Sequence, residues 1–133
     1  MSVQTTGTFQ MLSWNEQPYH ETQEEQRLAR ASVTNRFSGV VEGDGTLEYL
    51  LHYGESSAVS YIGLERVTGR IGDKAGSFVL QHSGTFEDGR AKGTWFVMPG
   101  SGTGDLRSLR GEGSFLAELH QKDVPYTLNY RFE

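Results

Sequence analysis

Apolar and polar residues alternate along most of the chain, in short stretches rich in Val, Thr, Tyr and Phe. Glycine, often beside Asp or Glu, separates one stretch from the next. Alternation with a period of two, bounded by turn residues, is typical of β-strands joined by tight turns. The pattern predicts eight strands, over residues 5–14, 27–38, 44–54, 58–71, 76–86, 91–98, 111–119 and 125–132. Helical periodicity is weak, and only residues 21–27 and 105–109 could hold a helical turn.

The strand pattern indicates an all-β fold, and the length of 133 residues indicates one domain over residues 1–133. Eight antiparallel strands are best satisfied by a closed barrel, because closure removes the exposed edges of a sheet. A sandwich of two sheets is the alternative. The interior of an eight-stranded barrel is either filled by side chains or holds one small ligand.

The turn at Asp88-Gly89 sets the pairing of the two strands that flank it. Asp-Gly is a strong signal for a two-residue hairpin loop, which pairs Glu87 with Arg90. Continuing this register along the strands places His82 opposite Trp95.

The turn after residue 71 carries this row onto a third strand. Pairing Gly72 with Ala75 places Glu65 opposite His82 on the same face. The sequence therefore predicts an inward row of Glu65, His82 and Trp95 on a mostly apolar surface. A carboxylate beside an imidazole in such surroundings can do acid–base chemistry, whereas the plainer interpretation is a buried pair whose members satisfy each other.

Three glycines lie beside this row in the same registers, with Gly63 opposite Gly84 and Gly84 opposite Gly93. Glycine inside a strand leaves space on the sheet or lets it bend sharply. We expect the line of Gly63, Gly84 and Gly93 to mark a bend that closes the barrel.

The strand over 44–54 leaves one question open. Its more apolar set of alternate residues, which includes Tyr49, is predicted to face inward. If the other set faced inward, Glu48 would lie close to Glu65, and two carboxylates beside an imidazole would suit catalysis or a divalent metal. The spacing is not diagnostic of a metal site, and none is expected.

Composition narrows the classes of function. The 133 residues include 17 glycines and no cysteine, so disulfides, thiolate metal sites and cysteine nucleophiles are excluded. A net charge of −5 argues against a nucleic-acid partner. No apolar run approaches the ~18 residues of a membrane-spanning helix, and residues 1–10 do not resemble a signal peptide. We therefore expect a cytoplasmic protein with no membrane partner.

Several segments carry a resemblance to known barrels. Phe9 and Trp14, the runs 63–69 and 76–86, and the Gly-Thr-Gly run at 102–104 resemble the bacterial family called domain of unknown function 3224. The run around 102–104 is also similar to one in allene-oxide-cyclase-type barrels. The resemblance implies a closed, calycin-like, eight-stranded barrel with a central cavity. Such barrels are often found in oligomers, and among possible homo-oligomers of this chain we expect a dimer.

The resemblance supplies no activity. The cyclases steer ring closure with a Glu, an Asn-bound water and a Cys, whereas this chain has no Cys and no matching Glu in its first strand. No catalytic residue is carried over from them, and no cofactor is implied.

The sequence favours a module that binds a small hydrophobic molecule inside the barrel, without a cofactor. Glu65 and His82 would be the few polar groups that orient the molecule. The predicted walls of the site are Tyr49, Tyr61, Phe78, Trp95 and Phe115. One alternative is a cyclase or isomerase with Glu65 and His82 as its catalytic acid–base pair. Another is a filled barrel that acts in an oligomer.

Overall fold

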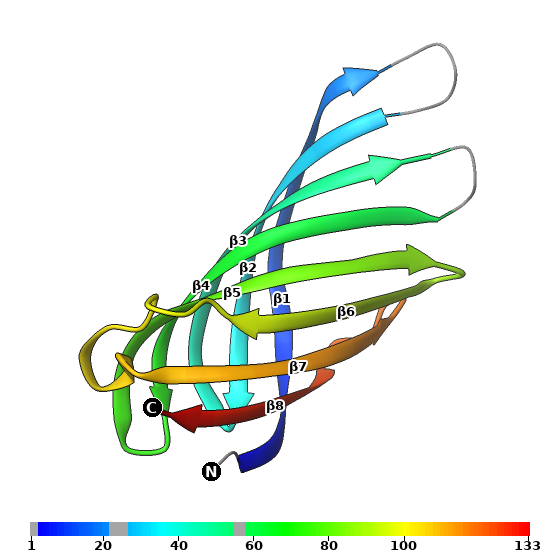
Figure 1. Cartoon of the computed structure of the whole chain (residues 1–133). Helices are drawn as coiled ribbons and strands as arrows, with labels where there is room; N and C mark the ends of the chain where they lie inside the picture. The colour runs from blue at the N-terminus through cyan, green and yellow to red at the C-terminus, as the bar shows by residue number, and fades with distance from the viewer. Residues whose placement is uncertain (1–2, 22–26, 55–57) are drawn as a thin grey trace.

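Eight antiparallel strands close into a barrel in the computed structural model, which describes residues 3–21, 27–54 and 58–133 (Figure 1). Each strand pairs with the next along the chain, and the last pairs with the first, so the predicted barrel is confirmed and the sandwich is excluded. The strands are β1 (Val3–Glu21), β2 (Arg27–Gly39), β3 (Val41–Tyr53), β4 (Val59–Ile71), β5 (Lys74–Glu87), β6 (Arg90–Val97), β7 (Leu109–Glu118) and β8 (Val124–Phe132). None of the helical structure in the described residues is long and apolar enough to cross a membrane.

The two ends of the barrel differ. Figure 1 shows the strands spreading apart toward the end at which β1, β3, β5 and β7 finish, which we call the open end. Both termini and the connection from β6 to β7 lie at the other, closed end. The predicted helical turn over 105–109 is a 3₁₀ turn, η1 (Gly104–Leu106), within that connection. The turn predicted over 21–27 falls largely on residues 22–26, outside the described residues.

The connection before β7 is held against β5 and covers the closed end. Thr103 donates a backbone hydrogen bond to the Ser77 carbonyl at 2.8 Å, and the Ser77 amide donates to Thr103 Oγ1 at 3.0 Å. Gly76 allows this approach, because a Cβ there would overlap the Thr103 carbonyl oxygen. Leu106, in η1, is fully buried as a result.

The predicted pairing of β5 with β6 is confirmed. Glu87 lies opposite Arg90, and His82 lies opposite Trp95. Asp88 and Gly89 both have positive φ, 54° and 76°. Positive φ at both central residues is what a type I′ hairpin turn requires, and Asp-Gly supplies it with little strain.

The predicted pairing of β4 with β5 is wrong by two positions. Ile71 pairs with Lys74, so Glu65 lies opposite Leu80 and His82 lies opposite Gly63. The cause is Gly72, whose φ of 62° makes it the first residue of the two-residue loop rather than the last residue of the strand. A shift of two keeps every side chain on its predicted face, because the side-chain period of a strand is two.

The predicted line of three glycines is corrected by the same shift. Gly84 lies opposite Gly93 as expected, but its partner on β4 is Tyr61 rather than Gly63.

A bulge in β1 was not predicted. The register between β1 and β2 shifts between Met11 and Ser13, which leaves Leu12 as an extra residue. Met11 lies opposite Asn35 and Trp14 lies opposite Val33, so the inward face passes from odd to even positions at the bulge.

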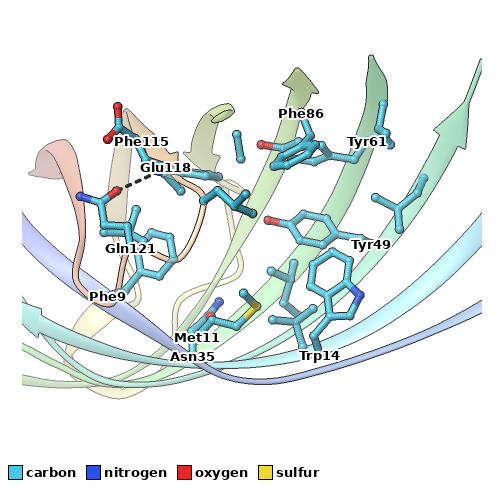
Figure 2. A pocket seen from close by; sticks show the side chains of 18 of the residues that line it. Phe9, Met11, Trp14, Asn35, Tyr49, Tyr61, Phe86, Phe115, Glu118 and Gln121 are labelled. Atoms are coloured by element: carbon cyan, nitrogen blue, oxygen red, sulfur yellow. Dashed lines mark hydrogen bonds between the residues drawn. The ribbon is translucent and has the colours of Figure 1, made fainter. Parts of the chain in front are cut away.

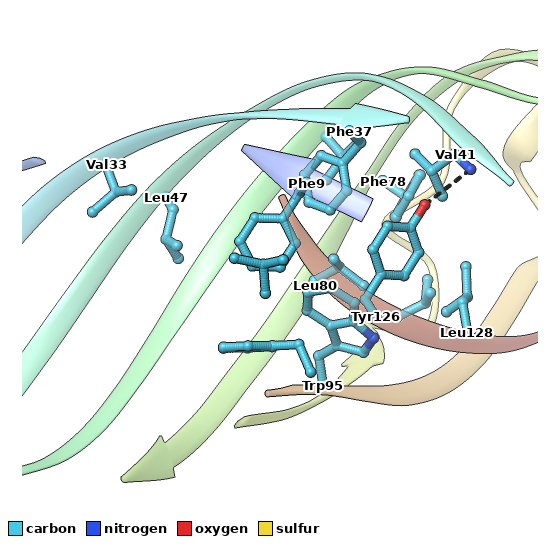
Figure 3. Close-up of a cluster of buried hydrophobic side chains, with 14 of the residues drawn as sticks. Phe9, Val33, Phe37, Val41, Leu47, Phe78, Leu80, Trp95, Tyr126 and Leu128 are labelled. Atoms are coloured by element: carbon cyan, nitrogen blue, oxygen red, sulfur yellow. Dashed lines mark hydrogen bonds between the residues drawn. The ribbon is translucent and has the colours of Figure 1, made fainter. Parts of the chain in front are cut away.

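Aromatic and aliphatic side chains fill the closed half of the barrel, as Figure 3 shows. Trp95 is central to this packing, with ring centroids 5.5 Å from Tyr126 and 6.2 Å from Phe37. Its Nε1 donates to the Thr127 carbonyl at 3.2 Å. The Tyr126 hydroxyl donates to the Ser38 carbonyl and accepts from the Val41 amide, both at 3.2 Å, which ties β8 to the β2–β3 turn.

Leu106→Ala is expected to lower the free energy of unfolding by about 2–5 kcal/mol, because it opens a void at the covered end of the core. Leu64→Ala is the matched control, since Leu64 is 51% exposed and its loss is expected to change stability by at most about 0.5 kcal/mol. Urea denaturation measures both values, and equal effects would show that η1 does not seal the core.

Stability is also expected to fall in alkali. Burial raises the pKa of Tyr126 to about 12, whereas a tyrosine in an unfolded chain titrates near ~10. The neutral phenol therefore favours the fold below about pH 10, and this contribution is lost as the pH rises toward 12. In urea denaturation across this window, Tyr126→Phe should show a shallower decline than the wild type; parallel declines would contradict the assignment.

Candidate functional site

The open half of the barrel holds a cavity of about 760 Å³ (Figure 2). Aliphatic side chains such as Leu47 and Leu51 form part of its wall. Gly54 and His120, in the connections at the open end, also border it, so the cavity reaches the mouth of the barrel. Its aromatic lining consists of Phe9, Trp14, Tyr49, Tyr53, Tyr61, Phe86 and Phe115.

Glycines opposite two of these rings leave the space in which the rings lie. A Cβ on Gly93 would overlap the Phe115 ring, and a Cβ on Gly84 would lie 2.6 Å from the Tyr61 hydroxyl oxygen. That hydroxyl donates to the Lys92 carbonyl at 3.0 Å, which fixes the ring against the wall. Gly84 and Gly93 therefore make room for rings at the cavity wall. This role differs from the bend that the sequence analysis expects at these glycines.

Glu65 forms a buried hydrogen-bonded cluster beneath the cavity. Its Oε1 lies 2.8 Å from His82 Nε2, and its Oε2 accepts from Asn35 Nδ2 at 2.8 Å. The exposed fractions are 0% for Glu65, 2% for His82 and 4% for Asn35. Glu65 and His82 are diagonal neighbours on β4 and β5, and their side chains meet despite the corrected register.

The cluster depends on Gly45 of β3. Gly45 lies opposite Asn35 on β2 and opposite Val67 on β4. A Cβ on Gly45 would overlap Glu65 Oε2. Because glycine has no side chain, the Glu65 carboxylate can cross over β3 and reach β2.

Asn35 is the functional candidate that sequence reasoning missed. The inward face of β2 carries apolar residues at alternate positions, which are Ala29, Ala31, Val33 and Phe37. Asn35 has the same parity, and it is both buried and part of the cavity lining. The available signal was one polar residue in an otherwise apolar alternating row, which indicates a buried group with a specific hydrogen-bond partner.

The predicted ligand-binding residues separate into two groups. Tyr49, Tyr61 and Phe115 line the cavity. The others are buried but absent from the lining, and they are Glu65, Phe78, His82 and Trp95.

Two rings of the cavity lining pack against the His82 imidazole. Its centroid is 5.7 Å from that of Tyr49 and 6.0 Å from that of Phe115, both of which line the cavity. The Trp95 ring also packs edge to face against the imidazole, with the centroids 5.2 Å apart. The Glu65–His82 pair is therefore enclosed below the cavity.

Glu48 faces outward, which settles the question about β3. Its Oε1 accepts from Arg30 Nη2 at 2.7 Å and from Ser32 Oγ at 3.0 Å, and these hydrogen bonds lower the pKa of the Glu48 carboxyl, with Ser32 the larger cause. The alternative that places Glu48 beside Glu65 is wrong. Within residues 3–21, 27–54 and 58–133, no group of three or more His, Cys, Asp or Glu side chains is arranged to hold a metal ion.

A polar cluster at the mouth was also missed. Glu16 Oε2 accepts from the Tyr53 hydroxyl at 2.6 Å and lies 3.4 Å from Arg27 Nη2, while its Oε1 accepts from Trp14 Nε1 at 3.1 Å. Burial, together with the hydrogen bond to Glu16, raises the pKa of Tyr53. After the bulge in β1, the even-numbered residues Trp14 and Glu16 lie on the inward face. A regular strand without the bulge would place them on the outer face, so the sequence pattern did not predict this cluster.

His82→Leu is expected to lower the free energy of unfolding by about 3–5 kcal/mol, because it leaves the Glu65 carboxylate buried without one of its two partners. The double variant Glu65→Leu/His82→Leu buries no charge and is expected to be more stable than His82→Leu alone. Urea denaturation provides the comparison. Glu48→Gln, in the exposed pair with Arg30, is the control and should change stability by at most about 1 kcal/mol. Additive losses in the double variant would contradict the coupling.

Comparison with known proteins identifies the family. No match is found among curated proteins. A crystal structure of a DUF3224-family protein of unknown function from Shewanella oneidensis MR-1 is similar over 100% of this chain and 99% of that chain, with 26% sequence identity and a TM-score of 0.81. A family model described as protein of unknown function (DUF3224) matches residues 5–130. Since that match spans nearly the whole barrel, the chain belongs to the DUF3224 family.

Proposed function

We propose that this protein binds a small, mainly apolar molecule in the open half of its barrel. The observation that carries the proposal is the cavity of about 760 Å³ with its aromatic and aliphatic lining. Pockets for small molecules commonly have volumes of about 300–1,000 Å³, a mostly apolar lining and a few placed polar groups. The cavity fits each of these criteria.

The packing around the cavity supports a built site. Gly84 and Gly93 leave room for the rings of Tyr61 and Phe115, which stand as walls. Below them the barrel is filled around Trp95, so the space ends in a firm base. A barrel that acts only through its outer surface has no need of such an unfilled half, and the cavity therefore favours binding over that alternative.

The geometry favours binding over acid–base catalysis as well. A catalytic acid or base must come within hydrogen-bond reach of the bound molecule. Glu65 and His82 are enclosed below the cavity, and both Glu65 oxygens already have protein partners. This arrangement suits a pair that shapes the base of the site.

A pair of neighbouring leucines allows a matched test. Leu51 is 5% exposed and lines the cavity, whereas Leu50 is 46% exposed on the outer face. Leu51→Trp is expected to fill part of the cavity and weaken binding of 2-methoxynaphthalene, a neutral apolar probe, by about tenfold or more, equivalent to ~1.4 kcal/mol. Leu50→Trp makes the same chemical change on the other face and is expected to bind the probe as the wild type does.

Titration by probe fluorescence measures the affinities, and thermal unfolding checks that both variants fold. Equal affinity in all three proteins would place the probe outside the cavity, and no binding to the wild type would overturn the proposal. Native mass spectrometry of gently extracted protein complements the titration, since a ligand that co-purifies with the wild type should be lost in Leu51→Trp.

A further inference from the structure

Asn35, which borders the base of the cavity, carries a buried polar acceptor without a partner among the described residues. Asn35 borders the cavity beside Met11 (Figure 2), and its Nδ2 donates to Glu65 below. Asn35 Oδ1 is buried and accepts no hydrogen bond from the described residues. A buried carbonyl oxygen without a donor is destabilising, and most such groups in proteins have a partner.

The chemistry of Glu65 fixes which way the Asn35 amide is turned. The amide carries an acceptor on one side and two donors on the other. Glu65 Oε1 is engaged with His82 Nε2. Glu65 Oε2 accepts from Asn35 Nδ2 at 2.8 Å, so the carboxyl engages the NH₂ side of the amide. The carbonyl oxygen is consequently the side of the amide that is left free.

We propose that the molecule bound in the cavity carries a hydroxyl group on the end that reaches the base, and that this hydroxyl donates to Asn35 Oδ1. The inference rests on the proposed function and names the class of ligand, a mainly apolar alcohol or phenol. A hydrocarbon or ether of the same shape leaves Oδ1 unpaired. A site with a buried polar group discriminates strongly against an analogue that cannot pair with it.

The phenol of Tyr49 is a reason to expect a hydroxyl on the ligand rather than a group that only donates hydrogen bonds. Its hydroxyl points into the cavity in Figure 2. Burial raises the pKa of Tyr49 well above its usual value, so the phenol keeps its proton and can donate it. A ligand hydroxyl can donate to one protein group and accept from another, which suits a cavity lined by an acceptor on Asn35 and a donor on Tyr49.

In this arrangement Glu65 and His82 are positioning residues. His82 holds the carboxylate, the carboxylate holds the amide, and the amide presents its oxygen to the ligand. The buried pair thus acts on the ligand through Asn35, without touching it.

A matched pair of ligands tests the proposal on the full chain. 2-Naphthol carries a hydroxyl, and 2-methoxynaphthalene replaces that donor by an ether. The wild type is expected to bind 2-naphthol about tenfold more tightly, the effect of one net hydrogen bond to a buried group. Asn35→Leu removes the acceptor, so the ratio of the two dissociation constants should fall to about one, while 2-methoxynaphthalene binds as tightly or more tightly.

Glu65→Gln tests the positioning role. A glutamine side chain both donates and accepts, so the Asn35 amide is free to turn over. We expect the preference for 2-naphthol to fall at least threefold while the affinity for 2-methoxynaphthalene is unchanged. A purely structural role would change both affinities together. Thermal unfolding checks the variant, and Asn35→Leu keeps the test decisive if Glu65→Gln does not fold.

The outcomes separate this inference from the proposed function. If the wild type binds both naphthalenes equally, the ligand hydroxyl does not pair with Asn35 and the inference is wrong, but the apolar site stands. If Asn35→Leu keeps the tenfold ratio, another group makes the preference and the assignment to Asn35 is overturned. If neither compound binds the wild type, both the inference and the proposed function fail.

Discussion

The narrow interior of an eight-stranded barrel is the constraint on which this structure depends. Large side chains fit inside because adjacent strands carry glycine where those side chains must lie. The arrangement recurs around the barrel: Gly7 leaves room for Tyr126, Gly45 for Glu65, Gly63 for Tyr49, Gly84 for Tyr61, Gly93 for Phe115 and Gly113 for Trp95. The high glycine content is therefore a packing requirement as much as a turn requirement.

The same constraint divides the barrel into two halves with different tasks. Toward the closed end, Trp95 and Tyr126 fill the interior and their polar atoms bond to backbone groups. Toward the open end, Tyr61 and Phe115 lie along the wall and leave the centre empty. The buried Glu65 cluster lies between the halves, where a polar group can be satisfied from below and still influence the cavity above.

Some of this architecture could be predicted from the sequence. Asp88-Gly89 determines its hairpin by local chemistry, so the opposition of His82 and Trp95 followed from one turn. The β4–β5 register failed because Gly72 can end a strand or begin a turn, and its backbone conformation decides between them. The bulge at Leu12 and the size of the cavity depend on packing among distant strands, which a single sequence does not display.

The corrected register also changes the meaning of the Glu65–His82 contact. In the diagonal arrangement Glu65 Oε1 meets His82 on β5, and Oε2 points the other way, across Gly45 toward Asn35 on β2. One side chain thereby connects β2, β4 and β5 and determines which atom of Asn35 remains free. The chemistry offered to a ligand at the base of the cavity thus depends on a glycine that itself contributes no functional group.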